Sequence, residues 1–461
     1  MTLISSISGI RGTIGGTISN NLTPIDIVKY TSAYSKVLLK TKQKPLVLVG
    51  RDGRVSGPQV QSLIVNTLLM MGIDVIDCGL TTTPTIEMGI IQYKTDGGIM
   101  VSASHNPMNW NALKLFNNKG EFIDKEVGIE IQELVLNGEF EYADYKSIGK
   151  IREINDVLEY HVKKIIELPY VNVDAIKKAN LKVAIDAINS TGGIAVPYLL
   201  DQLGVKKENI FTVNCEIQEE FAHNPEPLEK NLTDLSELVK DKKCDVGFAV
   251  DPDVDRLALI SQDGSYFGEE YTLVACADFV LRKNNGNTVS NLSSSRALKD
   301  ITEKYNAKYY ASAVGEVNVS TKMKAVNAVI GGEGNGGVIL PELHYGRDAL
   351  LGIALILSFL AESGKKLSVI RESYPYYYMA KEKISIKKDT DFSKIKEFVK
   401  NEISEGEFNE EDGLKIDFKD SWIHLRTSNT EPIIRVYSEA KSLEEAKNIA
   451  KKMIDLINTI V

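Results

Sequence analysis

The chain has 461 residues, of which 43% are hydrophobic and 25% charged, and its formal net charge is −9. This length exceeds the roughly 250 to 300 residues at which one hydrophobic core stops growing, so we expect three or four domains of an ordinary globular protein. The acidic balance argues against a nucleic-acid partner or an anionic membrane surface. The four scattered cysteines, with no CxxC pair, argue against a zinc knuckle or a disulfide framework.

The sequence shows no signal for export or for membrane insertion. Residues 1–9 lack the basic region and the long apolar stretch of a secretory signal. The longest apolar run, residues 349–361, is broken by Gly352 and Ser358 and falls short of the roughly 18 residues that span a bilayer, so it predicts a buried helix. We expect a cytoplasmic protein, with a monomer and a homodimer both left open.

Three segments share one order of elements: an apolar strand, a polar or glycine-bearing turn, and a helical pattern. Strands that alternate with helices in this way indicate parallel or mixed sheets, in which ligands gather at the carboxyl ends of the strands. The strands are predicted at 46–49, 182–185 and 288–292, the turns at 50–54, 186–193 and 293–295, and helices around 63–71 and from Arg296.

The last part of the chain has a different pattern. It predicts a strand at 383–386, a helix from Asp391, and strands around Trp422 and Ile434. We therefore expect an α/β protein with three related mixed-sheet domains followed by a smaller C-terminal α+β domain. Charged stretches near 145–155 and 261–271 suggest the joins, so the expected domain limits are 1–150, 151–261, 262–372 and 373–461.

The first polar loop, residues 102–107, follows an apolar run at 98–101. A serine in such a loop, here Ser104, can carry a phosphoryl group, with His105 or Asn106 to orient it and Lys114 to give or take a proton. Serine, asparagine and proline are also turn residues, and the loop by itself is more simply interpreted as a strand-ending turn.

The second polar loop contains three aspartates at alternate positions, Asp251, Asp253 and Asp255, after an apolar strand-like run. Such a set of oxygens suits a hard cation such as Mg²⁺, which also binds phosphate. Arg256 follows at once, and a metal beside a guanidinium is what a transferring phosphoryl group needs. An EF-hand is excluded, because its sixth position is Arg256 and its twelfth is Gln262. A solvated acidic turn stays open.

The third loop, residues 331–337, is glycine-rich and carries Glu333 and Asn335, which can grip sugar hydroxyls. It also matches GxGxxG, but Pro341 follows too soon for the helix of a dinucleotide site. A plain glycine-rich connection is the alternative.

The fourth loop, residues 426–432, combines cationic and hydroxyl side chains with exposed backbone N–H groups, and it predicts a phosphate cradle or, alternatively, a bare turn. Near the N-terminus, Arg11 is followed by Gly12 and can supply a further cation. The candidate phosphate-binding residues of the fourth loop are Arg426, Ser428, Asn429 and Thr430, with Arg435 beyond them.

Taken in this order, the loops resemble those of the α-D-phosphohexomutase family. Its members carry an N-terminal Arg-Gly-Thr, a Ser-His-Asn-Pro phosphoserine loop, an aspartate-rich metal loop, a Gly-Glu sugar loop and a C-terminal phosphate loop, and the match spans residues 8–437. The resemblance implies four domains around a central cleft. It also implies exchange of a phosphoryl group between O6 and O1 of a hexose phosphate, through a phosphoserine and a hexose 1,6-bisphosphate.

The resemblance also implies a role for each candidate residue. Ser104 would be the phosphoserine and, with Asp251, Asp253 and Asp255, would hold one Mg²⁺. Catalytic assistance would come from Arg11, His105, Lys114 and Arg256, sugar contacts from Glu333 and Asn335, and the grip on the non-reacting phosphate from Arg426, Ser428, Asn429, Thr430 and Arg435.

Departures from the family pattern bear on the sugar. Asn335 stands where many members have serine, Gly337 where several have histidine, and Glu316 where some have histidine or aspartate. The glycine-rich loop most resembles that of phosphoglucosamine-mutase-like members, so glucosamine phosphate is preferred over glucose or mannose phosphate. Pro252 should stiffen the metal loop without removing a carboxylate.

Two other functions, a phosphatase and a non-catalytic sensor, compete with this interpretation. Asp251-Pro252-Asp253-Val254 resembles the opening motif of aspartate-nucleophile phosphatases, although Asp255 departs from it. A non-catalytic sugar-phosphate sensor on the same fold is the other rival, and the intact Ser104, Lys114 and aspartates argue against it.

Overall fold

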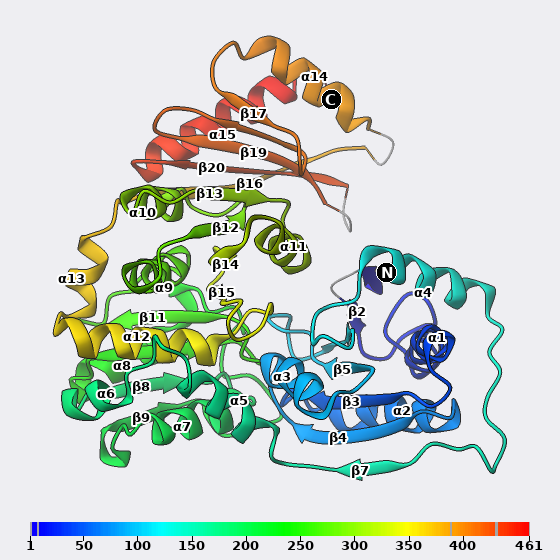
Figure 1. The fold of residues 1–461 in the computed structure, drawn as a ribbon. Helices are drawn as coiled ribbons and strands as arrows, with labels where there is room; N and C mark the ends of the chain where they lie inside the picture. The colour runs from blue at the N-terminus through cyan, green and yellow to red at the C-terminus, as the bar shows by residue number, and fades with distance from the viewer. Residues whose placement is uncertain (1, 7–8, 388–389, 429–431, 461) are drawn as a thin grey trace.

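Four β-sheets follow one another along the chain in a computed structural model that describes residues 2–6, 9–387, 390–428 and 432–460 (Figure 1). The first three sheets mix parallel and antiparallel strands and are flanked by helices, whereas the strand pairs of the fourth are antiparallel. The predicted fold class, three mixed-sheet α/β units and a smaller C-terminal unit, is therefore confirmed.

The first sheet has seven strands in the order β1-β2-β6-β5-β3-β4-β7. Helices α1, α2 and α4 cover one of its faces and α3 the other, since their buried side chains form two separate apolar clusters on the sheet. Its elements are β1 (Ile4–Ser6), β2 (Gly9–Thr13), α1 (Pro24–Thr41), β3 (Leu46–Arg51), α2 (Gly57–Met70), β4 (Asp74–Leu80), α3 (Thr83–Tyr93), β5 (Gly97–Val101), β6 (Trp110–Phe116), α4 (Lys125–Asn137) and β7 (Ile151–Glu153).

The second sheet has the order β11-β10-β8-β9 and the third the order β13-β12-β14-β15. Their elements are α5 (Val157–Ile166), α6 (Val173–Ala179), β8 (Val183–Asp186), α7 (Gly192–Gln202), β9 (Ile210–Val213), α8 (Thr233–Lys242), β10 (Val246–Val250), β11 (Leu257–Ser261), α9 (Glu269–Lys283), β12 (Asn287–Asn291), α10 (Ala297–Lys304), β13 (Tyr309–Ser312), α11 (Glu316–Val326), β14 (Ala328–Glu333), β15 (Gly337–Ile339), α12 (Ala349–Ser363) and α13 (Leu367–Glu372). Two 3₁₀ turns, Lys207–Asn209 and Glu229–Asn231, complete this region.

These two sheets share one large hydrophobic core, whose buried residues come from both units, between Val162 and Tyr374 in the sequence. Helix α12 lies at its centre, and it packs against α6 from the second unit and against α9 from the third. The apolar run at 349–361 thus forms the buried helix that the sequence predicts. Among the described helices, none has both the length and the apolar character that a bilayer crossing requires.

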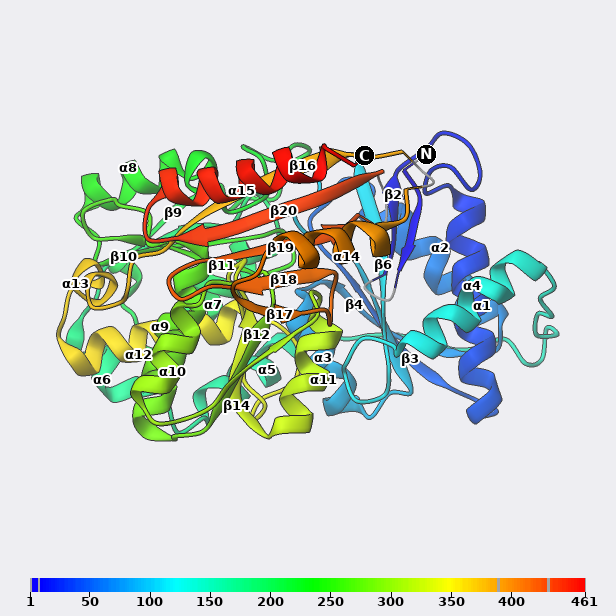
Figure 2. The same cartoon turned by 90° about the horizontal axis from the view of Figure 1, so that it is seen from above.

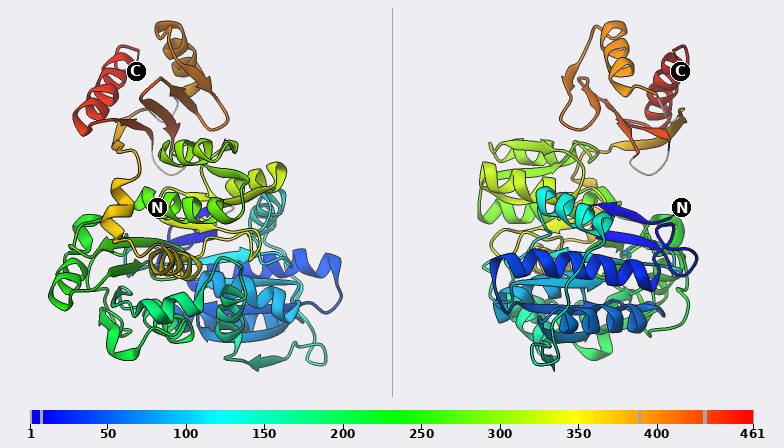
Figure 3. Two further views of the ribbon diagram at one scale, coloured as in Figure 1. Left: turned by 60° about the vertical axis from the view of Figure 1, so that its left-hand side comes forward. Right: turned by 90° about the vertical axis from the view of Figure 1, so that its right-hand side faces the viewer.

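The fourth sheet stands above the third unit and has the order β16-β20-β19-β18-β17 (Figures 1 and 3). Helices α14 and α15 cover its outer face, so its other face is turned toward the rest of the molecule (Figures 1 and 2). Its elements are β16 (Tyr378–Ser385), α14 (Phe392–Glu402), β17 (Glu407–Asn409), β18 (Leu414–Asp417), β19 (Trp422–Thr427), β20 (Ile433–Ala440) and α15 (Leu443–Ile457).

Two element boundaries differ from the sequence expectation. Strand β7 begins at Ile151 and pairs with β4 of the first sheet, so this sheet extends past the limit expected at residue 150. Strand β16 begins at Tyr378, five residues before the predicted start at Lys383, because its whole length pairs with β20 although most of its side chains are exposed.

Candidate active site

The predicted polar loops come together around one cleft of about 600 Å³ that receives side chains from all four units. The three aspartates lie buried beside it, with no exposed surface. Ser428 follows the last residue of β19, while Asn429 and Thr430 lie outside the described residues. The predicted site residues that line the cleft are Arg11, Ser104, His105, Lys114, Arg256, Glu333, Asn335, Arg426 and Arg435.

Ser104 lies in the turn that follows β5 and borders the cleft. Its φ of 48° places it in the left-handed region, which is uncommon for a residue other than glycine. Its amide N–H donates to the Ser102 hydroxyl at 3.0 Å, and its own Oγ donates to Asp251 Oδ2 at 2.6 Å. His105 Nδ1 lies 3.4 Å from the same Oγ. The serine oxygen is therefore fixed against the aspartate cluster.

The three aspartates occupy the loop between β10 and β11, and their ligand atoms lie within 4.8 Å of one another. Asp251 Oδ1 accepts the backbone N–H groups of Asp255 and Arg256 at 3.0 and 3.1 Å. Asp253 Oδ2 accepts from the Thr83 hydroxyl and from Lys114 Nζ. Asp255 Oδ2 likewise accepts from Lys114 Nζ and Arg347 Nη2, so at least one oxygen of each carboxylate is held by a donor within the protein.

The other oxygens of the cluster identify a place for a cation. Within the described part of the chain, no hydrogen-bond donor reaches Asp253 Oδ1 or Asp255 Oδ1, although both are buried. Together with Asp251 Oδ2 and Ser104 Oγ they offer four oxygens, the ligand type that Mg²⁺ prefers. Burial and the neighbouring Asp255 and Asp253 raise the pKa of Asp251 well above its ordinary value, as expected where anions await a counter-ion. The residues fit a magnesium ion.

Lys114 lies under the cleft on β6 and is held by two of the aspartates. Its Nζ is 2.5 Å from Asp253 Oδ2 and 3.1 Å from Asp255 Oδ2. Burial alone would lower the pKa of Lys114, but Asp253 and Asp255 outweigh it and raise the pKa above the ordinary value. The lysine is therefore protonated, and it becomes a stronger acid only when a cation offsets the negative charge of the aspartates.

Two arginines face the same region of the cleft. Burial lowers the pKa of Arg11, and the nearby Arg256 and Arg347 lower it further. Among the described residues, none accepts a hydrogen bond from the buried Nε of Arg256. Arg256, burial and Arg11 also lower the pKa of His105 well below its ordinary value, which leaves the imidazole neutral. This concentration of positive charge suits a phosphoryl group.

Arg347, which no sequence motif identified, joins the metal loop to the sugar loop. Its Nη2 is 2.7 Å from Asp255 Oδ2, its Nη1 is 2.7 Å from Glu333 Oε2, and its Nε is 3.0 Å from Glu316 Oε2. The guanidinium occupies one oxygen of Asp255 and leaves the other facing the cation site. One buried arginine thus neutralises carboxylates from three segments.

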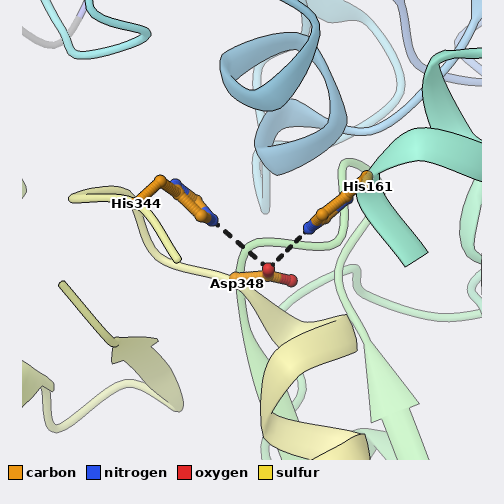
Figure 4. Close-up of side chains that lie close together, drawn as sticks. All are labelled: His161, His344 and Asp348. Atoms are coloured by element: carbon orange, nitrogen blue, oxygen red, sulfur yellow. Dashed lines mark hydrogen bonds and ion pairs between the residues drawn. The ribbon is translucent and has the colours of Figure 1, made fainter. Parts of the chain in front are cut away.

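Asp348 anchors the segment that carries Arg347. His161 Nε2 and His344 Nε2 lie 2.8 and 3.3 Å from Asp348 Oδ2 (Figure 4), and Asp348 Oδ1 accepts the Leu351 N–H at the start of α12. On its other side, His344 Nδ1 lies 2.9 Å from Glu87 Oε2 of α3. Side chains of the first three units therefore meet in one buried network behind Arg347.

The glycine-rich loop forms the turn between β14 and β15, an antiparallel hairpin, and no helix follows it before residue 349. This geometry rules out the dinucleotide site. Glu333 Oε1 accepts from Asn291 Nδ2 at 2.8 Å and from the Gly315 N–H at 3.1 Å. Burial raises the pKa of Glu316, which also faces the cleft, to about 8.

The cleft-facing side of the fourth sheet carries a row of cations. Arg435 on β20 pairs with Arg426 on β19 and with Lys383 on β16, so the three side chains share one face. Like charges on neighbouring strands repel one another unless an anion lies between them. Of the two arginines in this row, Arg426 has an ion pair to Asp412, with Nε 3.1 Å from Asp412 Oδ2. The row suits a phosphate group.

Comparisons with known proteins agree with this arrangement. Models of the phosphoglucomutase/phosphomannomutase alpha/beta/alpha domains I, II and III match residues 4–142, 159–264 and 268–377, and that of the C-terminal domain matches 381–456. A phosphoglucomutase/phosphomannomutase of Thermococcus kodakarensis is 37% identical over 97% of this chain and 98% of its own. A phosphoglucosamine/phosphogalactosamine mutase of Sulfurisphaera tokodaii is 31% identical over 97% of both chains.

A solved structure has the same fold. The phosphoglucomutase/phosphomannomutase family protein of Burkholderia thailandensis covers 100% of this chain and 99% of its own, with a TM-score of 0.83 at 23% identity.

Proposed function

Because the chain belongs to the phosphoglucomutase/phosphomannomutase family and is therefore a phosphohexomutase, an isomerase, we propose that it moves a phosphoryl group between O6 and O1 of a hexose phosphate, with Ser104 as the carrier. One observation carries this proposal: Ser104 Oγ borders the cleft and lies 2.6 Å from Asp251, beside the only carboxylate triad that the described residues form. The proposed nucleophile Ser104, the proposed cation site at the three aspartates and the guanidinium of Arg256 thus lie in the same part of the cleft.

The proposed reaction has two transfers. The P–O bond to phosphorylated Ser104 breaks as a bond to the free hydroxyl of the hexose monophosphate forms; the proton of that hydroxyl passes to a base in the cleft, and Ser104 Oγ takes up a proton. The hexose 1,6-bisphosphate then turns over. Its other phosphoryl group is transferred to Ser104 Oγ, which gives up its proton, and the sugar oxygen that loses the phosphoryl group is protonated. Phosphate is conserved in each cycle, and Lys114, which the neighbouring aspartates keep protonated, is the proposed proton donor.

The chain's own groups account for the stabilisation of charge. Arg256 and Arg11 would contact the equatorial oxygens of the transferring group, where charge is spread. Mg²⁺, held by Ser104, Asp251, Asp253 and Asp255, would supply Lewis-acid polarisation of a phosphoryl oxygen. Arg426 and Arg435 would hold the phosphate at the far end of the sugar, joined in the proposal by Ser428, Asn429 and Thr430. Binding the far end fixes the reacting end and makes the transfer effectively unimolecular.

The aspartate-nucleophile alternative is disfavoured by the position of Asp251. This residue has no exposed surface, its Oδ1 holds two backbone N–H groups and its Oδ2 holds Ser104. A nucleophilic carboxylate needs one oxygen directed at the phosphorus atom.

We propose glucosamine 6-phosphate and glucosamine 1-phosphate as the substrate pair. The form of the glycine-rich loop supports this choice, as does the similarity to the phosphoglucosamine/phosphogalactosamine mutase of Sulfurisphaera tokodaii. Glucose or mannose phosphate is the second candidate, because the phosphoglucomutase/phosphomannomutase of Thermococcus kodakarensis is more similar, at 37% identity. Glu333 and Asn335 are the proposed sugar contacts.

A substrate panel tests both the proposed isomerisation and the proposed preference for glucosamine phosphate. With Mg²⁺ and a catalytic amount of glucose 1,6-bisphosphate, we expect isomerisation of hexose 6-phosphates, fastest for glucosamine among glucosamine, glucose, mannose and N-acetylglucosamine phosphates. Equal rates throughout would remove the preference for glucosamine. Rapid release of inorganic phosphate without an isomer would refute the mutase itself.

A further inference from the structure

Arg54, in the turn after β3, lies completely buried below the Ser104 loop. Its Nη2 donates to the carbonyl oxygens of Ser104 and Asn106 at 2.5 and 2.7 Å, and its Nη1 to those of Pro107 and Trp110 at 2.6 and 3.1 Å. Its Nε donates to Asp52 at 3.1 Å. A guanidinium has five N–H donors, and Arg54 uses all five in hydrogen bonds to the Ser104 loop, to the start of β6 and to Asp52.

Asp52 completes the arrangement from the other side. One of its oxygens accepts the Arg54 backbone N–H at 3.0 Å and the other accepts Arg54 Nε. Asp52 is also hydrogen-bonded to the Ser102 side chain, and the Ser102 hydroxyl oxygen accepts the Ser104 N–H at 3.0 Å. The pair therefore holds the Ser104 backbone at both ends, its carbonyl through Arg54 and its amide through Ser102.

This grip has a conformational consequence for Ser104. Its φ of 48° is unfavourable for a residue with a Cβ atom, and such a conformation persists only where the surroundings over-determine it. If φ relaxed to a negative value, Oγ would leave its position 2.6 Å from Asp251. The hydrogen bonds that Ser104 makes with Arg54 and Ser102 hold it in a backbone conformation that serine does not itself favour.

We propose that Asp52 and Arg54 form a positioning pair that keeps Ser104 in the left-handed conformation needed for phosphoryl transfer. This inference rests on the proposed function, since it assigns the pair to the carrier serine. The Phe221 ring, 5.1 Å from the Arg54 guanidinium, covers it from the second unit. Lysine cannot replace this arginine, because an ammonium group has three donors and no planar fork.

The test compares Arg54→Lys and Ser102→Ala with a matched control, Arg51→Lys. Arg51 is the last residue of β3, three positions before Arg54, but it is only partly buried, and its Nη1 donates to the Asp52 carbonyl oxygen at 3.2 Å. Two quantities are measured in the full-length protein: steady-state kcat and KM for the hexose phosphate, and the rate at which glucose 1,6-bisphosphate phosphorylates Ser104 in a single turnover. Thermal unfolding is recorded for every variant.

We expect Arg54→Lys to lower kcat and the phosphorylation rate about 100-fold with little change in KM, because a displacement of about 1 Å at the reacting atom has such an effect. Ser102→Ala removes one bond and should lower both rates roughly tenfold, and it keeps the test valid if Arg54→Lys does not fold. Arg51→Lys should match the wild type.

Three outcomes would overturn the inference: wild-type rates in Ser102→Ala, a rise in KM in place of the loss in kcat, or an equal loss in Arg51→Lys. A wild-type protein that does not isomerise hexose phosphates would instead refute the proposed function, so the two failures are distinguishable.

Discussion

Asp253 and Asp255 each give one carboxylate oxygen to nitrogen donors, while the other oxygen accepts no hydrogen bond in the described structure, with Arg256 Nε 3.9 Å from that of Asp255. Two such oxygens side by side in a buried loop repel each other unless a cation lies between them. This arrangement, more than the number of acidic residues, distinguishes a metal site from a solvated acidic turn.

A metal titration tests this interpretation. Chelation with EDTA should abolish isomerisation and added Mg²⁺ should restore it. Asp253→Asn should weaken Mg²⁺ binding by at least the roughly 10- to 100-fold that loss of an outer-shell partner causes, measured by calorimetric titration, because an anionic ligand becomes a neutral one. Asp263→Asn, in a surface turn, is the control and should bind Mg²⁺ like the wild type. Unchanged affinity in Asp253→Asn would exclude this loop as the metal site.

Arg347 supports a second prediction at the residue scale. Removing its charge leaves Asp255, Glu333 and Glu316 buried without their shared partner. Arg347→Met should therefore lower the free energy of unfolding by about 3 to 5 kcal/mol in denaturant melts. Lys40→Met, which breaks the solvent-exposed pair with Glu130, should cost less than about 1 kcal/mol. Comparable losses in the two variants would contradict the assigned role of Arg347.

The candidate catalytic and metal-binding residues at strand ends could be predicted from the sequence, but the residues that position them through hydrogen bonds and ion pairs could not. Ser104 and the three aspartates stand in short polar loops after apolar strands, which is a local pattern. Arg347 lies 92 residues from Asp255 in the chain, in a segment without a motif, and only the fold brings the two together. Arg54 was part of a predicted turn, yet nothing local indicates that its donors reach the Ser104 loop.

At the scale of elements, the buried network of Figure 4 joins α3, α5 and the segment before α12. Burial alone would lower the pKa of His344, but hydrogen bonds to Asp348 and Glu87 raise it from the ordinary 6.5 to about 10. The folded state thus binds a proton that the unfolded state releases above pH 6.5. Its stabilisation is complete below pH 6.5 and is lost as the pH rises through about 10.

Thermal melts across this range test the network. His344→Gln should lower Tm most near pH 6.5, and the difference from the wild type should shrink steadily toward pH 10.5. His424 is the control, because burial lowers its pKa to about 4 and it stays neutral above pH 6.5. The effect of His424→Gln should not vary over this interval. A constant difference for His344→Gln would show that its imidazole is uncharged in the folded protein.

Central elements could be predicted more reliably than edge elements. The strands predicted at 46–49, 182–185 and 288–292 match β3, β8 and β12 to within two residues at each end, and the helix expected from Asp391 is α14, with Asp391 as its N-cap. These segments are apolar or carry a distinct cap. The three-residue strands β1, β7 and β17 have no apolar periodicity, and they form because a neighbouring strand offers pairing groups. In the metal loop, Val254 adopts a φ of 63°, which is unfavourable for a β-branched residue, and its side chain is buried.

At the scale of the whole molecule, the second and third units are less independent than three separate α/β domains would be. Their common core, centred on α12, joins the metal loop and the sugar loop through one packed interior. The sequence pattern placed a helix at 349–361 but could not show that two sheets bury it together. Domain limits stay a prediction, whereas the order of the four units follows from the strand pairing.

The cleft requires all four units, because Ser104 comes from the first, the aspartates from the second, Glu333 and Arg347 from the third, and Arg426 and Arg435 from the fourth. The central claim is that Ser104 receives and returns the phosphoryl group within this cleft. Peptide mass mapping tests it most directly, after incubation of the protein with glucose 1,6-bisphosphate and Mg²⁺. We predict one phosphoryl group on the peptide that contains Ser104, and neither label nor isomerisation in a folded Ser104→Ala variant. Sustained isomerisation by that variant, or phosphate on a different residue of the active protein, would contradict the account.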